Sequence, residues 1–261
     1  MNTICFGQQP NGFFPKRFLV AKINAARKLQ KEIGGKIVYF FHDSDADYRE
    51  TITVMKDRNT GAEVRLNFIQ ENKLQKNFSP LYAKRIPLSS KQEILKQLPR
   101  FVNKELIDMF ESTSDNLVAD FCLTMYHKLG LLEDMEIVRS GGKRFREEAS
   151  NLEKDFFADV EYEGEIVRAR IEIDEAKNII GALHHGGGKY TRFPIEKPLQ
   201  KWQKNPAADS RFAWMNSVIK CTHYIYGEGE GQYLKFSDFP EVTFIEREKI
   251  DQADHAWLLE K

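Results

Sequence analysis

Hydrophobic and polar positions near the start of the chain alternate between strand and helix periods. Thr3 to Phe6 predicts a short strand, and the turn-rich loop Gly7 to Gly12 follows it. Apolar residues then recur at helical spacing, which predicts a helix with Pro15 in its first turn and an end at Gly34. Lys36 to Phe41 is a continuous apolar run, as expected of a strand covered on both faces. Together these elements predict a βαβ unit.

The middle of the chain predicts short strands mixed with helices. Two β-hairpins are expected at about 52–68 and 155–173, each around a turn that contains glycine. The segment Ser90 to Glu93 fits a capping box that begins a helix reaching Leu98. The remaining predictions here are helices at about 104–111 and 117–129 and an irregular loop at 184–189.

Towards the C-terminus the pattern returns to alternating helices and strands. Ser210 to Ile219 predicts a helix, Thr222 to Tyr226 a strand, and Val242 to Ile245 another strand. The glycine-rich stretch 227–231 predicts a loop, and 251–259 predicts a terminal helix. The pattern as a whole predicts an α/β fold, with a Rossmann-like, mostly parallel sheet flanked by helices and inserted β-hairpins.

Length and composition narrow the class of protein. A chain of 261 residues suits one α/β domain, and the sequence allows an α+β insertion at about 52–205. A hydrophobic content of 41% supports a buried core and excludes wholesale disorder. Lys and Arg total 39, as do Asp and Glu, so the chain lacks the positive field of non-specific nucleic-acid binders. We expect a small-molecule substrate and no nucleic-acid partner, and the oligomeric state stays open.

Targeting signals and cysteines bear on location. The longest clean apolar run near the start is far shorter than the roughly 20 residues of a membrane-spanning helix. The first residues lack a basic start followed by an apolar segment, so secretion is not expected. Three widely spaced cysteines fit reduced, buried thiols better than disulfides or a zinc site. The sequence therefore predicts a cytoplasmic protein with no membrane contact.

The first candidate for chemistry is the loop after the first strand. Glycines let backbone approach a ligand, and free amides at a helix start attract anions such as phosphates. The loop matches neither the dinucleotide fingerprint nor the P-loop, and a tight strand-to-helix turn is the alternative interpretation. The candidate nucleotide- or phosphate-binding residues are Gly7, Gln8, Gln9, Asn11, Gly12, Lys16 and Lys22.

The second candidate directly follows the predicted buried strand, in the segment His42 to Asp47. Ligands of open α/β sheets bind beyond the carboxyl ends of the strands. Asp45 and Asp47 would project to one side of an extended chain, where carboxylates can hold Mg²⁺, grip a ribose or accept a proton. The alternative is an Asp-rich turn that caps a following helix.

Two further glycine-rich segments carry weaker signals. In 227–231, Glu228 and Glu230 alternate with glycines and could bind hydroxyls, an amine or a metal, although such loops are common in hairpins. In 184–189, two adjacent histidines diverge in direction, so we assign no metal site there. A lid over an anion or a plain surface loop remain the two interpretations of that segment.

The first three candidates together resemble a known family. Gly7-Gln8-Gln9-Pro10, followed at matching spacing by Lys22, is similar to the opening motif of the bacillithiol biosynthesis cysteine-adding enzymes. Asp45 and Asp47 match the acidic pattern after the second strand of that family, with Ser44 and Ala46 in place of its Glu and His. Near the C-terminus the matching positions are Arg211, Tyr224, Gly227, Gly229, Glu230, Tyr233 and Arg247, with Glu228 in place of a proline.

The resemblance covers about 1–55 and 208–250 and implies both a fold and a reaction. The family has a Rossmann-like core related to class I tRNA synthetases and nucleotidyltransferases, with a nucleotide site. Its members add a long helical coiled coil after the last motif, so the resemblance implies that this chain is either the catalytic core alone or a shortened relative. The family reaction attaches cysteine to a glucosaminyl-malate amine.

We therefore predict a nucleotide-binding, ligase-like enzyme that joins a carboxylate, such as that of cysteine, to an amine. ATP or another nucleotide is the expected cofactor, and the use of Mg²⁺ stays open. Asp45, Asp47 and Glu230 are the predicted catalytic residues, and the predicted substrate-binding residues are Arg211, Gly227, Glu228, Gly229, Tyr233 and Arg247. The replaced motif positions leave two alternatives open, a nucleotidyltransferase-type enzyme on the same core and a non-enzymatic nucleotide- or small-molecule-binding module.

Overall fold

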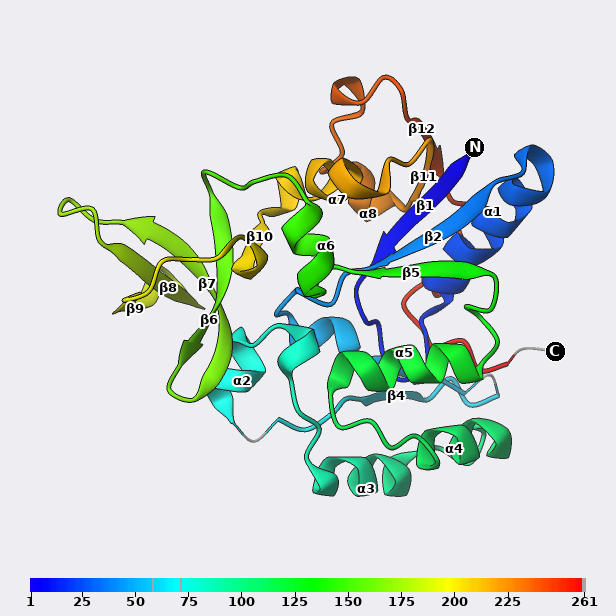
Figure 1. Cartoon of the computed structure of the whole chain (residues 1–261). Coiled ribbons are helices and arrows are strands. Elements are labelled where there is room, and N and C mark those ends of the chain that lie inside the picture. Colours follow the sequence, from blue (N-terminus) through cyan, green and yellow to red (C-terminus); the bar gives the residue numbers. More distant parts are fainter. Residues whose placement is uncertain (58, 71, 260–261) are drawn as a thin grey trace.

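A five-stranded parallel sheet forms the centre of the protein. The computed structural model describes residues 1–57, 59–70 and 72–259. The strand order is β12-β11-β1-β2-β5, and every neighbouring pair is parallel (Figure 1). The strands are β1 (Thr3–Gln8), β2 (Lys36–Phe41), β5 (Met135–Arg139), β11 (His223–Tyr226) and β12 (Thr243–Glu246). The predicted Rossmann-like α/β fold is confirmed.

Side chains of this sheet pack into a separate hydrophobic cluster on each face. In β2, Ile37, Tyr39 and Phe41 lie in one cluster, whereas Val38 and Phe40 lie in the other. Helices α1 (Arg17–Ile33) and α5 (Val118–Lys128) cover the first face, and α6 (Lys143–Glu148) and α7 (Arg211–Ile219) cover the second. Burial on both faces explains why β2 is continuously apolar rather than alternating.

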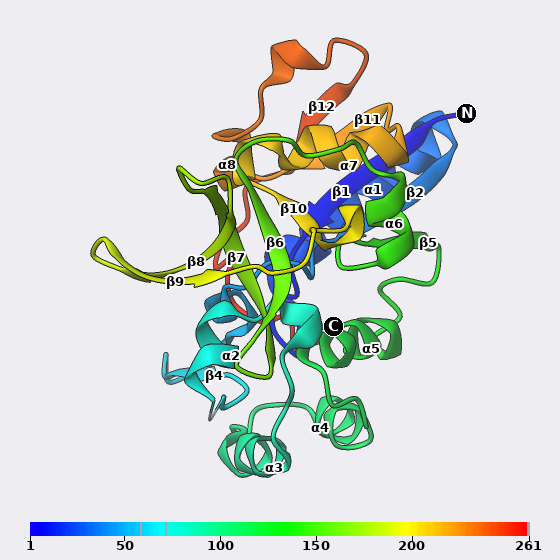
Figure 2. The same ribbon diagram turned by 60° about the vertical axis from the view of Figure 1, so that its left-hand side comes forward.

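A second, antiparallel sheet lies beside the parallel one. Its order is β10-β6-β7-β8-β9, and Figures 1 and 2 show it on the far side of α6 and α7 from β5 and α1. Helix α2 (Lys73–Phe78) contributes Phe78 to the small core of this sheet. The strands are β6 (Phe156–Tyr162), β7 (Glu165–Ile173), β8 (Ile179–Gly186), β9 (Lys189–Pro194) and β10 (Lys204–Pro206).

The remaining elements extend the layer around α5. The hairpin of β3 (Thr53–Lys56) and β4 (Glu63–Leu66) packs there with α3 (Leu88–Gln97) and α4 (Lys104–Glu111). Short helices fill several connections. They are η1 (Tyr48–Thr51), η2 (Leu81–Ala83), η3 (Lys201–Gln203), η4 (Ala208–Ser210), α8 (Glu228–Gly231) and η5 (Phe236–Asp238).

A buried ion pair and several hydrogen bonds hold the two sheets against each other. Arg146 of α6 is 2% exposed and donates to the carboxylate of Asp159 in β6 at 2.7 Å. Tyr82 donates to the same carboxylate oxygen, also at 2.7 Å. From β7, Arg168 donates to the carbonyl oxygens of Ser44 and Pro206 at 2.9 and 3.0 Å. The antiparallel sheet is thereby tied to the loop that follows β2.

Several predicted elements are confirmed with small shifts of their ends. Both hairpins form, although Arg58 in the first turn lies outside the described residues, and helices α4 and α5 occupy the predicted ranges. Cys5, Cys122 and Cys221 are buried free thiols, as expected. Within the stretch 52–205, where the sequence allows an α+β insertion, β5 pairs with β2 of the parallel sheet. The number of domains stays a prediction.

Other predictions of secondary structure are wrong. Residues 184–189 are not an irregular loop, because they end β8 and begin β9 in a tight glycine hairpin. Helix α3 begins at Leu88 rather than at a capping box, and the Ser90 hydroxyl instead accepts the backbone N–H of Ile69. The segment 251–259 forms turns and two isolated bridges rather than a helix, because its backbone is used to contact other elements, at Pro15 and Val54.

Candidate functional site

A cavity of about 750 Å³ opens at the carboxyl ends of the parallel strands. The chain leaves β1 towards β2 on one side, and β11 pairs with β1 on the other, so the order of the sheet reverses between β1 and β11. Residues that follow β1, β2, β11 and β12 all line the cavity. Open α/β sheets bind ligands at this kind of reversal point.

Lys22 and Glu230 form a clasp across one wall of the cavity. Lys22 extends from α1 and is 3% exposed, and its ammonium donates to Glu230 at 2.7 Å. Its other two partners are the carbonyl oxygen of Gly7 at 2.8 Å and the Gln8 side chain at 3.3 Å. The second carboxylate oxygen of Glu230 accepts from Tyr224 at 2.5 Å. All three ammonium protons therefore have acceptors. Because these acceptors lie at the end of β1 and in the segment after β11, the clasp joins the two segments.

The space at Gly7 is limited by Tyr224, the second partner of Glu230. A Cβ at that position would lie 2.8 Å from the Tyr224 hydroxyl oxygen, closer than atoms can pack. Burial, and then the negative charge of Glu230, raise the pKa of Tyr224 well above its ordinary value, so the hydroxyl stays protonated as a donor. The absence of a side chain at Gly7 therefore lets the end of β1 approach the side chain of Tyr224 in β11.

Asp45 and Arg211 form another part of the cavity wall. Asp45 accepts from the Gln9 side chain at 3.3 Å and lies 3.5 Å from the Arg211 guanidinium, while Arg168 approaches it to 3.9 Å. Burial would raise the pKa of Asp45, but the positive charges of Arg168 and Arg211 outweigh it and hold that pKa below its ordinary range. Asp45 is thus a carboxylate at neutral pH, held within a cationic setting.

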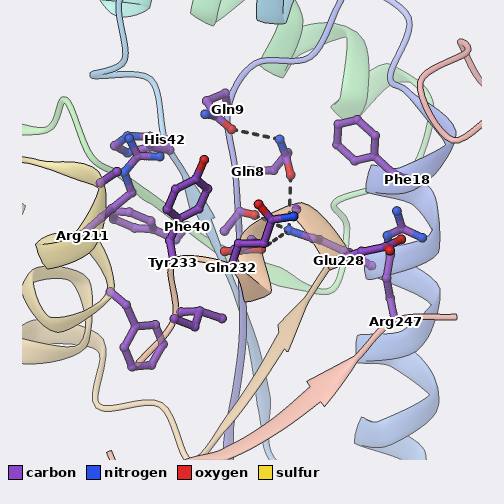
Figure 3. Close-up of a pocket in the computed structure, with 18 of the residues that line it drawn as sticks. Gln8, Gln9, Phe18, Phe40, His42, Arg211, Glu228, Gln232, Tyr233 and Arg247 are labelled. Atoms are coloured by element: carbon purple, nitrogen blue, oxygen red, sulfur yellow. Dashed lines mark hydrogen bonds and ion pairs between the residues drawn. The ribbon is translucent and has the colours of Figure 1, made fainter. Parts of the chain in front are cut away.

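His42 lies beside this wall, directly after β2. Its ring stacks on Phe40 with 5.9 Å between the centroids, and both residues line the cavity. Burial and the nearby guanidinium of Arg211 lower the pKa of His42 well below its ordinary value, so the ring is neutral. Figure 3 shows His42 and Arg211 together on one side of the cavity and Glu228 and Arg247 on the other.

The start of α1 does not offer the anion site that the sequence predicts. The helix begins at Arg17 rather than Pro15, and the C-terminal segment crosses its first turn. The backbone N–H groups of Arg17 and Phe18 donate to the carbonyl oxygens of His255 and Ala253, at 2.9 and 3.0 Å. These amides are therefore already satisfied by protein.

Three of the predicted phosphate-binding residues lie outside the cavity lining. Asn11 is fully buried and accepts from the Tyr126 hydroxyl at 2.8 Å. Gly12 has a φ of +110°, and a Cβ there would lie 2.7 Å from the Thr53 hydroxyl oxygen. Lys16 is 8% exposed and forms a bridge with Ala256. These residues shape the turn into α1, and the interpretation as a tight strand-to-helix turn describes this part of the loop.

The two aspartates after β2 diverge, contrary to the expectation that they project together. Asp47 caps the short helix η1 through the backbone N–H of Arg49 at 2.9 Å, and it also pairs with the Arg49 guanidinium at 2.6 Å. It does not line the cavity, whereas Asp45 does. The turn at Asp45 causes the divergence, because its carboxylate accepts the N–H groups of Ala46 and Asp47 and bends the chain.

The segment 227–231 forms the short helix α8 instead of a loop. Its two glutamates differ, since Glu230 belongs to the clasp while Glu228 is exposed and pairs with Lys249 at 3.5 Å. Arg247 follows β12 and lies against Gly227, with its Nε atom 3.4 Å from where a Cβ would be. Tyr233 is 60% exposed at the cavity rim.

The cavity therefore brings together residues from both ends of the chain. The predicted site residues that line it are Gly7, Gln8, Gln9, Lys22, Asp45, Arg211, Gly227, Glu228, Gly229, Glu230, Tyr233 and Arg247. Sequence reasoning missed His42 as a site residue, although its place directly after a buried strand was a usable signal. It also missed Phe40 and Arg168, and no local signal marks Arg168, which comes from the other sheet.

Comparisons with known proteins add no identity: no family model matches the chain, and no curated protein matches it either. Within the described part of the chain, no helix has the length and apolar character needed to cross a membrane. The same residues contain no group of three or more His, Cys, Asp or Glu side chains arranged to hold a metal ion.

Proposed function

We propose that the chain is a ligase-like enzyme that binds a nucleotide in this cavity and joins a carboxylate to an amine. The observation that carries the proposal is the convergence of Gly7–Gln9 and Gly227–Glu230 on one cavity at the reversal point of a parallel sheet. A volume of about 750 Å³ lies within the usual range for small-molecule sites. The resemblance of the same segments to the bacillithiol biosynthesis enzymes supports the same class.

The charges of the cavity suit such a reaction. Arg247 on one side can face the phosphates, and Arg211 on the other can face an acidic substrate group. A substrate carboxylate oxygen would attack a phosphorus of ATP, releasing pyrophosphate or ADP, and the amine would then displace AMP or phosphate while losing a proton. The protein would act by orienting the two substrates and stabilising charge.

The roles of the clasp residues follow from their contacts. Lys22 and Glu230 satisfy each other, so in this proposal they fix the wall that the nucleotide approaches rather than bind it alone. Asp45 is the carboxylate that can accept an amine or hydroxyl, because the partners of its Oδ2 atom, the Gln9 and Arg211 side chains, lie at 3.3 and 3.5 Å and hold it loosely. We further propose that the protein acts in the cytoplasm on small molecules and not on nucleic acid.

Isothermal titration with ATP, ADP and AMP, each with and without Mg²⁺, tests the proposal. We expect at least one nucleotide to bind, and Arg247→Gln to weaken it about tenfold, the loss of one charge-assisted hydrogen bond. Arg144→Gln is the control, because Arg144 is exposed on α6 away from the cavity. If no nucleotide binds the wild type, the proposal is wrong.

An assay of products then separates the alternatives. With ATP, amino acids and glucosaminyl-malate present, amide formation with pyrophosphate or ADP release supports the ligase. Pyrophosphate release without amide formation favours a nucleotidyltransferase, and binding without any turnover favours a non-enzymatic module.

A further inference from the structure

The His42 ring is buried without any hydrogen bond. The residue is 2% exposed, and neither ring nitrogen has a partner among the residues that the structure describes. Buried polar side chains are normally satisfied, so an orphaned one needs a reason. Because His42 lines the cavity, a molecule in the cavity is the nearest available partner.

The neighbouring guanidinium is also incompletely paired. The Nε atom of Arg211 is buried and has no partner within the described chain, and its Nη2 lies 3.5 Å from Asp45, at the limit of a hydrogen bond. His42 and Arg211 stand next to each other on the same side of the cavity (Figure 3). Two buried donors therefore face one region without an acceptor.

The charges around this region favour an anion. Arg211 and Arg168 both approach Asp45, at 3.5 and 3.9 Å, so two positive charges meet one carboxylate. Arg146, the next cation, is neutralised by Asp159 at 2.7 Å. Two guanidinium groups therefore share one carboxylate here, and an anion bound beside them would balance the second positive charge.

We propose that His42 and Arg211 form a subsite for the oxyanion group of a substrate, a carboxylate or a phosphate. This inference deepens the proposed function and rests on it, because it names the class of ligand at one wall of the same cavity. The neutral imidazole donates one N–H to the first oxygen, and the guanidinium donates to the second. Arg168, fixed by the Ser44 and Pro206 carbonyls, is a positioning residue that holds Asp45 aside.

Titration calorimetry with malonate and with inorganic phosphate tests the subsite. We expect wild type to bind at least one of them, and His42→Phe and Arg211→Gln each to weaken that binding tenfold or more. His184→Gln is the matched control, since His184 is an exposed histidine on β8 stacked on Tyr190. Malonate binding alone points to a carboxylate substrate, and phosphate binding alone points to a phosphorylated one.

Histidine ring nitrogen NMR gives a second readout, which needs only His42→Gln to fold and does not depend on His42→Phe or Arg211→Gln. In wild type, the probe that binds should shift the signals of one histidine, and that histidine should be the one missing from the spectrum of His42→Gln. The subsite is wrong if neither probe binds, if both variants bind as wild type does, or if the shifted signals belong to another histidine.

ATP titrations on the same samples keep the two proposals apart. Loss of malonate or phosphate binding in the variants supports the subsite even if ATP does not bind wild type. Conversely, ATP binding with unchanged anion binding in the variants overturns the subsite and leaves the proposed function standing.

Discussion

Replacing Glu230 by Gln tests the clasp that joins the two ends of the chain. The substitution keeps the size of the side chain and an acceptor for Tyr224, but it leaves the ammonium of Lys22 buried without a counter-charge. Breaking a fully buried ion pair costs about 3–5 kcal/mol. Because the Glu230 side chain is 29% exposed, we expect water to reduce the loss to about 2–3 kcal/mol.

Thermal unfolding followed by circular dichroism measures this loss. In a chain of this size, 1 kcal/mol shifts Tm by about 2–4 °C, so Glu230→Gln should lower Tm by about 4–12 °C. Glu228→Gln is the control, two residues away in the same short helix. Its pair with Lys249 is exposed on both sides and should contribute at most about 0.5 kcal/mol.

A double variant separates charge from packing. Lys22→Met with Glu230→Gln removes the unpaired ammonium and should be more stable than Glu230→Gln alone. Equal Tm values for Glu230→Gln and Glu228→Gln would refute the reasoning, as would a double variant less stable than the single one.

Three further substitutions test other contacts. Asp159→Asn should lower the free energy of unfolding by about 3–5 kcal/mol in urea titrations, because it strands the buried guanidinium of Arg146. Gly12→Ala should cost about 1–3 kcal/mol in the same assay, because the left-handed backbone and the Thr53 hydroxyl oppose a side chain. His42 is neutral when folded but takes up a proton when unfolded below its ordinary pKa of 6.5, so stability falls as pH falls. Between pH 7.5 and 5.5, proton uptake by His42 in the unfolded chain lowers the free energy of unfolding by about 1.4 kcal/mol. The His42→Gln variant should lack this loss in urea titrations across that range.

Each of these has a matched control. Asp108→Asn breaks only an exposed pair with Lys104, so a loss as large as that of Asp159→Asn would contradict the first. Gly229→Ala meets no atom within 4 Å and should be nearly neutral, in contrast to Gly12→Ala. The exposed His184→Gln should keep the acid sensitivity of wild type, and an unchanged pH profile in His42→Gln would contradict the third.

The local elements of the fold were predictable where one physical signal dominates. The apolar run of β2 and the Gly34 end of α1 carry such signals, since burial on both faces and a left-handed cap each demand particular residues. Strand β5 was missed because its residues are only partly buried at the sheet edge and include Glu136 and Arg139. The tail was wrongly predicted as helical because its backbone contacts Pro15 and Val54, which no local pattern reveals.

The candidate site also contains residues that a local signal selects and residues whose contacts no local signal reveals. Position after a strand was enough to select Asp45 and the segment after β11, because strand ends meet at one edge of a parallel sheet. Arg247 was selected only through the family resemblance, and it also lines the cavity. Contacts over long sequence separations decided the rest. Lys22 was selected as a phosphate ligand, yet Glu230, 208 residues away, engages it, and the amides at the start of α1 are taken by Ala253 and His255.

The central place of β1 has a consequence for how the chain acquires its structure. During synthesis β1 and β2 can pair as soon as both have emerged, since only α1 separates them, but the partner on the other edge of β1 lies beyond residue 220. Until then the edge of β1 is open to wrong partners, and the apolar residues Ile4 and Phe6 lie on that unprotected strand. We therefore expect the parallel sheet to be completed late, because β1 obtains its second neighbour only after β11 has been made.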